Sequence, residues 1–265
     1  MESEGELVKT VRPVEAFRRL GRQVFSFGLD LLYPPTCLDC HAPVASSDAL
    51  CARCFGKMRP ITAPYCPRLG IPFQHDLGPG ALSAEAIADP PPFERARSAV
   101  LYNEVARAIV SRMKYGDRPE LANFCARLML RAGHELWGDD AVLVPVPLNR
   151  WRQLSRRYNQ STELARALSR LTGIAVEPGL VTRHRNTRQQ VGLTRDARHR
   201  NVSGAFRPHP HLFGRLKGRR VILVDDVITT GSTIAAVTRT LTKAGVDKVD
   251  VISFARVVVG QETTT

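Results

Sequence analysis

Along the second part of the chain, short aliphatic runs alternate with stretches in which apolar residues recur every three or four positions. The runs predict strands, and the periodic stretches predict helices. This alternation is typical of a parallel sheet covered by helices, so an α/β domain is expected over residues 93–260. The expected strands are residues 98–102, 141–146, 221–224 and 249–254, and the expected helices are residues 104–114, 121–136, 160–171 and 234–244.

The first 92 residues follow a different pattern. Apolar residues between positions 14 and 32 fall at helical spacing, which predicts an N-terminal helix over residues 1–32 that ends before Pro34. Residues 33–70 contain five of the six cysteines and form a candidate zinc-ribbon module. Residues 71–92 are rich in glycine, proline and alanine without a steady period, so they are expected to be a linker.

Two C-x-x-C pairs separated by ten residues predict a zinc site in the second of these segments. Four thiolates suit a tetrahedral zinc, and such a closed site is structural because it leaves no position for a substrate. Free cysteines or a redox pair are the alternative. Cys66 is not expected to bind metal, because Leu69 stands where a partner cysteine would be, and Cys125 is expected in the core. The predicted ligands are Cys37, Cys40, Cys51 and Cys54.

The sequence VILVDDVITTGST at residues 221–233 holds the candidate ligand site. Asp225 and Asp226 come at the carboxyl end of a predicted strand, where parallel sheets bind their ligands. Carboxylates suit the two hydroxyls of a ribose, with Mg²⁺ held by the same ligand. The turn that follows opens a helix, and its backbone amides and hydroxyls suit a phosphate. A ribose 5-phosphate group is therefore expected at these acids and at Thr229, Thr230, Gly231, Ser232 and Thr233, the alternative being a strand that simply ends in a polar turn.

Two arginine-rich segments are candidates for binding a pyrophosphate. The first follows the sequence VPVP at residues 144–147, and its guanidinium groups suit phosphate oxygens. A solvated charge run is the alternative. The second, residues 183–201, is long for a connection and is expected to be a lid or disordered. The candidates are Arg150, Arg152, Arg156, Arg157, Asn159 and Gln160 in the first segment, and Arg183 and Arg185 in the second.

Net charge adds to this picture. Lysine and arginine outnumber aspartate and glutamate by 38 to 25, which gives a formal charge of +13 and favours phosphorylated or polyanionic ligands, unless the charge only coats the surface. The sequence contains no secretory signal pattern and no apolar run of about twenty residues, so no membrane span and a cytoplasmic location are expected.

The motif at residues 221–233 resembles the signature with which type I phosphoribosyltransferases bind phosphoribosyl pyrophosphate (PRPP). Receiver domains of phosphorelays share a strand that ends in two acids, but only 39 residues follow Asp226, too few for that fold. Further motifs resemble the ComF family of competence-associated, phosphoribosyltransferase-like proteins. They are L-x-P-P-x-C at residues 32–37, KY at 114–115, VPVP at 144–147, RRYNQ at 156–160 and R-x-R-x-T at 183–187. Arg157 and Tyr158 depart from the family's Gly-Phe.

This resemblance implies PRPP or a nucleotide 5-phosphate as ligand, bound with Mg²⁺, and a link to DNA uptake or nucleotide metabolism. It also implies single-stranded DNA and other competence proteins as partners. The chain is expected to be a phosphoribosyltransferase, although no catalytic residue is identified because the acceptor is unknown. The alternatives are a nucleotide-sensing or single-stranded DNA-binding protein without transfer chemistry, and a zinc-ribbon adaptor. Aromatic residues, on which single-strand binders stack bases, make up only 6% of the chain.

Overall fold

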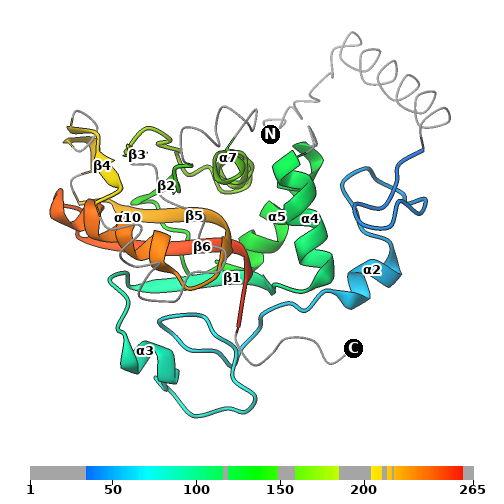
Figure 1. Ribbon diagram of the computed structural model, residues 1–265, viewed down its shortest axis with the longest axis horizontal. Helices are drawn as coiled ribbons and strands as arrows, with labels where there is room; N and C mark the ends of the chain where they lie inside the picture. The colour runs from blue at the N-terminus through cyan, green and yellow to red at the C-terminus, as the bar shows by residue number, and fades with distance from the viewer. Residues whose placement is uncertain are drawn as a thin grey trace, which may run out of the picture. The chain divides into compact units, whose positions relative to one another are not determined.

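The computed structural model describes residues 34–115, 119–148, 159–184, 204–210, 214–216 and 218–258 (Figure 1). The chain forms two compact units that adjoin in sequence at Cys51 and Ala52, and each is described by itself. The predicted N-terminal helix over residues 1–32 lies outside the described residues, as do Arg150, Arg152, Arg156, Arg157 and Arg185.

A four-stranded parallel sheet forms the centre of the second unit, with the strand order β1-β6-β5-β2. The strands are buried along nearly their whole length, which is why β2 and the first half of β5 read as continuous aliphatic runs, whereas β1 and β6 also bury Arg97 and Asp250. The predicted α/β fold with a parallel sheet is confirmed. The strands are β1 (Arg95–Leu101), β2 (Ala141–Pro145), β5 (Arg220–Ile228) and β6 (Lys248–Arg256).

Helices cover the sheet, with α5 and α7 packed side by side and α10 across the sheet from them (Figure 1). Helix α7 has clear ends: Asn159 caps its first turn by accepting a hydrogen bond from the Ser161 N–H, and Gly173 closes it in the left-handed conformation. Helix α10 presents Ile234 and Val237 to the core beside the sheet. The helices are α4 (Glu104–Tyr115), α5 (Pro119–Ala132), α7 (Gln160–Thr172) and α10 (Ser232–Lys243).

Several short elements were not expected from the sequence. Helix α3 (Ala84–Ala88) lies inside the predicted linker, and its N-cap is Ser83, whose side chain accepts from the Ala86 N–H. Five residues are too few to show helical periodicity. The remaining elements are equally short: helix α2 (Ala52–Lys57), the antiparallel pair β3 (Val181–Arg183) and β4 (Phe206–Pro208), and the 3-10 turn η1 (Gly214–Leu216). The predicted domain boundaries stay a prediction.

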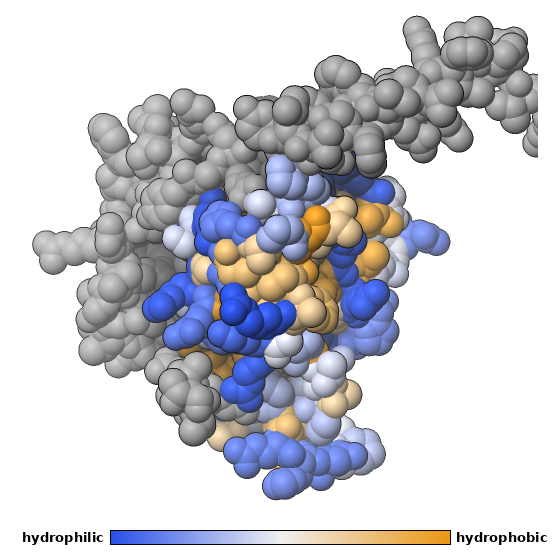
Figure 2. Space-filling view, turned by 90° about the vertical axis from the view of Figure 1, so that its right-hand side faces the viewer, coloured by the Kyte–Doolittle hydropathy of each residue, from blue (hydrophilic) through white to orange (hydrophobic). Residues whose placement is uncertain are grey.

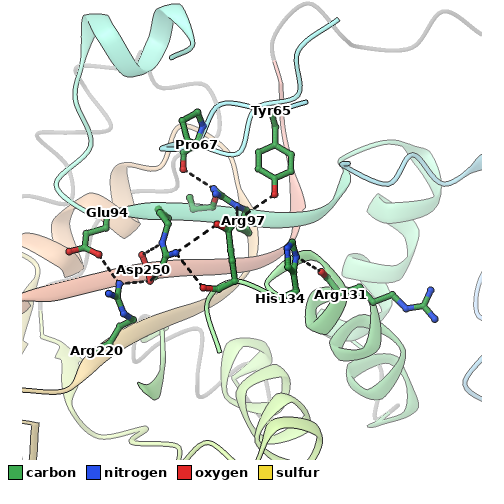
Figure 3. Close-up of polar contacts among 11 residues, drawn as sticks. Tyr65, Pro67, Glu94, Arg97, Arg131, His134, Arg220 and Asp250 are labelled. Carbon is green, nitrogen blue, oxygen red and sulfur yellow. Dashed lines mark hydrogen bonds and ion pairs between the residues drawn. The ribbon is translucent and has the colours of Figure 1, made fainter. Parts of the chain in front are cut away.

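A buried carboxylate joins three strands of the sheet (Figure 3). Asp250 on β6 is fully buried, and its Oδ2 lies 2.7 Å from Arg95 Nη2 on β1 and 2.7 Å from Arg220 Nη1 on β5. Next to it, Arg97 pairs with Glu135, which follows α5, and stacks over the Tyr65 ring with 4.7 Å to the centroid. Burial alone would raise the pKa of Glu135, but the neighbouring guanidinium groups of Arg97 and Arg95 hold it below its ordinary value.

The face of the molecule seen in Figure 2 carries apolar surface bordered by strongly hydrophilic residues. Separately, a hollow of about 390 Å³ is lined by residues from α2, β1 and α5, among them Phe55, which is half exposed. None of the helices in the described parts of the chain is long and apolar enough to cross a membrane.

Candidate functional site

The two predicted acids lie on β5 just beyond the end of its neighbour β2. The last paired residue of β2, Pro145, is opposite Val224, so Asp225 and Asp226 are the first residues of β5 that extend past it. The strand itself runs on to Ile228 alongside β6, which is longer than the sequence pattern predicted. The carboxylates therefore lie where β5 extends beyond its neighbour β2, and not at the end of β5 itself.

Two side chains from different helices contact these acids. Ser161, in the first turn of α7, donates a hydrogen bond from Oγ to Asp225 Oδ1 at 3.0 Å. Lys114, in the last turn of α4, places Nζ 3.1 Å from Asp226 Oδ2. Asp225 Oδ1 also accepts from the Asp226 N–H, and Asp226 Oδ1 accepts from the Val227 N–H. Helices α4 and α7 thus hold both carboxylates in place from outside their strand.

The pKa of Asp225 is raised to about 8, first by burial and then by the charge of Asp226. Hydrogen bonds from the Asp226 N–H and Ser161 and the charge of Lys114 offset part of this increase. Asp225 is therefore mainly protonated at neutral pH in the chain without ligand. The other acid, Asp226, is already paired with Lys114 before a hydroxyl-bearing ligand arrives.

The turn after β5 leads directly into the N-terminus of helix α10. Gly231 is the N-cap of α10 with φ 73°, and because glycine has no side chain, it provides no side-chain cap for the helix. Added side-chain atoms at Gly231 would meet no other atom of the described protein, so within the protein it is the left-handed backbone that favours glycine here. The Thr230 and Ser232 hydroxyls lie 2.9 Å apart, and Thr229 and Thr230 are exposed.

Three of the predicted pyrophosphate candidates lie in the described residues, and each contacts the protein itself. Asn159 caps α7 and donates from Nδ2 to the Val146 carbonyl at 3.1 Å. Gln160 is buried, with Nε2 3.5 Å from the Met113 carbonyl oxygen. Arg183 lies over the Phe206 ring, with 5.5 Å to the centroid. These contacts give the three residues a structural role, and their binding of a pyrophosphate stays a prediction.

The four predicted zinc ligands come together. Their Sγ atoms all lie within 4.8 Å of one another, and those of Cys40 and Cys51 are 3.6 Å apart. A tetrahedral zinc with Zn–S bonds of about 2.3 Å needs sulfurs about 3.8 Å apart, so the cluster fits the metal. Burial by itself raises the pKa of the Cys37 thiol, but the backbone N–H groups of Cys51, Asp39 and Cys40 more than offset this and lower it. Such N–H···S bonds are the ones that orient metal-binding thiolates.

Cys66 lies in a turn that repeats the one at the first zinc pair. The Cys37 N–H donates to the Ala42 carbonyl at 2.7 Å, and the Cys66 N–H donates to the Ile71 carbonyl at 2.8 Å. In the second turn Leu69 takes the place of the second cysteine, and its N–H lies 3.5 Å from Cys66 Sγ. Cys66 is not part of the four-cysteine group, which is the one cluster of its kind within the described residues. Cys125 is buried in α5, as predicted.

Comparisons with known proteins agree with both parts of this description. A family model for a double zinc ribbon domain matches residues 28–86, and one for a phosphoribosyl transferase domain matches residues 159–263. A DNA utilization protein, YhgH, from Salmonella typhimurium is 33% identical over 233 residues, which cover 85% of this chain and 99% of the relative. Competence protein F from Haemophilus influenzae is 30% identical over 227 residues, which cover 83% of this chain and 96% of that protein.

The chain belongs to the ComF family. A hypoxanthine/guanine phosphoribosyltransferase from Methanobacterium lacus is also similar, with 39% identity over 91 residues, 34% of this chain and 44% of that protein. The predicted phosphoribosyltransferase-like fold with an N-terminal four-cysteine ribbon is thereby confirmed for this ComF protein. The ribbon match and the cysteine geometry together support structural zinc.

Neither of the residues that hold the acids was assigned a role from the sequence. Lys114 belongs to a family motif that assigns it no contact, and Ser161 belongs to none of the sequence motifs. Ser161 lies 64 residues from Asp225 in the sequence, so no local pattern links the two. The one sequence signal that could have placed Ser161 was Asn159, which caps α7 and so puts Ser161 in the first turn of that helix.

Proposed function

We propose that this ComF protein binds the ribose 5-phosphate group of PRPP or of a nucleotide, together with Mg²⁺, and acts as a phosphoribosyltransferase. DNA uptake or nucleotide metabolism would be its setting, in keeping with the names of its relatives. The observation that carries the proposal is the continuity of the site: the acid pair, the exposed hydroxyl turn and the uncapped start of α10 follow one another within a single strand–turn–helix unit.

Each part of that unit suits one part of the ligand. The amides at the start of α10, with Thr230 and Ser232, would donate hydrogen bonds to the 5-phosphate. Asp225 and Asp226 would accept hydrogen bonds from the two ribose hydroxyls, and their separate anchors on α7 and α4 keep them in position. Bound Mg²⁺, held by the ligand's own oxygens, would neutralise charge on the leaving pyrophosphate.

Transfer at the anomeric carbon passes through a transition state with positive charge on the sugar. Catalysis of such a step depends on positioning the sugar and stabilising the leaving group rather than on a strong base. Lys114, already 3.1 Å from Asp226, would help to balance the charge of the ligand.

Release of pyrophosphate separates an enzyme from a binding protein. PRPP and Mg²⁺ would be incubated with the zinc-loaded chain and a panel of nitrogen heterocycles, and pyrophosphate would be measured with a coupled assay. Acceptor-dependent release supports a transferase. Saturable PRPP binding without release from any acceptor would reduce the proposal to a nucleotide sensor, and a lack of PRPP binding would contradict it.

Single-stranded DNA binding is the second candidate, favoured by the net charge of +13. If Arg150, Arg152 and Arg156 bind DNA phosphates, their replacement by alanine should lower DNA affinity and flatten its salt dependence by about 0.7 per lost contact. If they serve a pyrophosphate, the same variant should lose PRPP affinity and keep most of its DNA affinity. A direct contact with another competence protein, through the zinc ribbon, is compatible with either result.

A further inference from the structure

The turn at Cys66 repeats the backbone of the turn at Cys37. The His41 N–H donates to the Cys37 carbonyl at 3.2 Å, and the Gly70 N–H donates to the Cys66 carbonyl at 2.7 Å. His41 and Gly70 also share a left-handed backbone, with φ 60° and 65°. An isolated antiparallel bridge closes each turn, and the bridged pairs are Thr36 with Pro43 and Tyr65 with Pro72. The two segments are therefore two copies of one ribbon turn.

A short helix follows each turn, and the residue before that helix contacts the cysteine of the turn. Cys51 precedes α2, and its backbone nitrogen lies 3.2 Å from Cys37 Sγ. Ser83 is the N-cap of α3, and its N–H and its hydroxyl both donate to Cys66 Sγ. The second C-x-x-C pair of the first ribbon therefore corresponds to Ser83 and Ala86, which have the same spacing.

The sulfur of Cys66 receives the same set of backbone donors as that of Cys37. Burial by itself would raise the pKa of the Cys66 thiol, but the N–H groups of Ser83, Leu69 and Arg68 and the Ser83 hydroxyl more than offset this and lower it. The donors in the first ribbon stand at the corresponding positions, and they are the N–H groups of Cys51, Cys40 and Asp39. The second ribbon thus keeps the arrangement that orients a metal-binding thiolate.

The ligand positions of the second ribbon nevertheless do not suit zinc. Leucine and alanine side chains offer no atom to a metal, and a neutral serine hydroxyl is not among the usual zinc ligands. Only one thiol remains, because the four positions hold Cys66, Leu69, Ser83 and Ala86. The double zinc ribbon model that matches residues 28–86 implies a metal in each ribbon, so this chain departs from it at the second one.

Contacts with the α/β domain take the place of the metal. Leu69 packs against the hydrophobic core of that domain. The Ala96 N–H on β1 donates to the Arg68 carbonyl at 2.8 Å, and Arg68 Nη2 donates to the Phe93 carbonyl at 3.0 Å. A Cβ at Gly70 would lie 2.4 Å from the Ala96 carbonyl oxygen, so the turn fits against β1 only with glycine there. The strand beside it therefore holds the second ribbon in place.

We infer that residues 64–88 form a second ribbon that binds no zinc and serves as a fixed wall of the α/β domain. One hydrogen-bonded thiol, and side chains that donate to it or pack on the domain, fill its four ligand positions. Leu69 and Ile71 line a hollow of about 200 Å³ together with Thr229 and Gly231 of the turn after β5. The second ribbon therefore shapes the surroundings of that turn, and loss of zinc from the first ribbon should leave this wall in place.

Hydrogen exchange of the full chain, before and after EDTA has removed the zinc, compares amides that correspond in the two ribbons. The first set is Cys37, His41 and Val44, and the second set is Cys66, Gly70 and Phe73. Without zinc the first set should exchange at least about tenfold faster. The second set should change by less than about twofold, because β1 and not a metal holds its turn. Acceleration of the second set by the same factor as the first would overturn the inference.

Metal analysis of a variant with restored cysteines tests the correspondence of the ligand positions. Leu69→Cys with Ser83→Cys and Ala86→Cys should bind a second zinc, whereas the natural chain binds one. The matched control adds three thiols at exposed positions far apart in the sequence and should bind one zinc: Thr62→Cys with Ile87→Cys and Leu171→Cys. A second zinc in the natural chain, or its absence from a folded restored variant, would contradict the inference. If the restored variant does not fold, hydrogen exchange in the natural chain decides.

Discussion

Lys114 Nζ lies 3.1 Å from Asp226 Oδ2 and joins the last turn of α4 to the acid pair on β5. Both side chains are partly shielded, with 27% and 15% of their surfaces exposed. The lysine therefore reduces the negative charge of the site before any ligand arrives. This matters because the proposed ligand is itself a polyanion, which an unpaired Asp226 would repel.

Loss of this lysine should accordingly weaken binding. Lys114→Met is expected to lower PRPP affinity about tenfold, the order of one charge-assisted contact. The pair is partly exposed, so the unfolding free energy should change by less than about 1 kcal/mol. Lys243→Met, on the exposed end of α10, removes the same charge and should leave the affinity unchanged. Equal losses of PRPP affinity in the two variants would mean that only the net charge of the chain, and not the position of Lys114, affects binding.

The raised pKa of Asp225 predicts a dependence of stability on pH. An aspartate titrates near pH 3.9 in the unfolded chain, whereas Asp225 titrates at about 8 in the folded one. Between these values the folded chain holds a proton that the unfolded chain has lost, so this group lowers stability as pH rises, by at most about 1.4 kcal/mol per pH unit. Asp225→Asn does not titrate.

Urea unfolding from pH 5 to pH 8 measures this effect. The unfolding free energy of Asp225→Asn relative to the natural chain should increase steadily over that range. Asp247→Asn, at an exposed position, should follow the natural chain at every pH. Parallel curves for Asp225→Asn and the natural chain would show that Asp225 is not protonated in the folded state.

The cysteine cluster predicts one zinc per chain. Cys51→Ser combined with Cys54→Ser should abolish zinc in metal analysis, and Cys66→Ser should retain it because Cys66 is not in the cluster. Structural zinc contributes roughly 10–16 kcal/mol of apparent binding free energy in small modules. A chelator should therefore unfold the cysteine segment and spare the α/β domain, as read by hydrogen exchange. Zinc retained by the double variant would disprove the assignment.

The buried network at Asp250 should stabilise the sheet. Asp250→Asn leaves Arg95 and Arg220 without their shared charge partner and should lower the unfolding free energy by about 3–5 kcal/mol. Glu135→Gln, whose side chain is 31% exposed, removes a neighbouring carboxylate and should cost about 1 kcal/mol or less. Urea unfolding of both variants checks the difference. Similar losses of unfolding free energy in the two variants would show that the burial of Asp250 does not determine its contribution to stability.

The sequence predicted the features that are local in the chain. The aliphatic strand, the two acids and the hydroxyl turn are consecutive, and each C-x-x-C pair lies in one turn, so their chemistry could be inferred from spacing alone. The contacts of Ser161 and Lys114 with the acids could not be inferred, because they depend on β2 lying beside β5 and on where α4 ends. The cap that Asn159 forms on α7 was not inferred either, because its place among arginines drew attention to phosphate binding, which stays a prediction.

The most direct test of the ribose-phosphate site is a calorimetric titration of PRPP with Mg²⁺ into the zinc-loaded chain and into two double variants. Asp225→Asn with Asp226→Asn removes the acid pair, and Asp139→Asn with Asp247→Asn makes the same change of charge at exposed positions. We predict one PRPP site per chain in the natural protein and in the exposed-position variant, and no measurable site in the acid-pair variant. Undiminished PRPP affinity in a folded acid-pair variant would contradict this prediction.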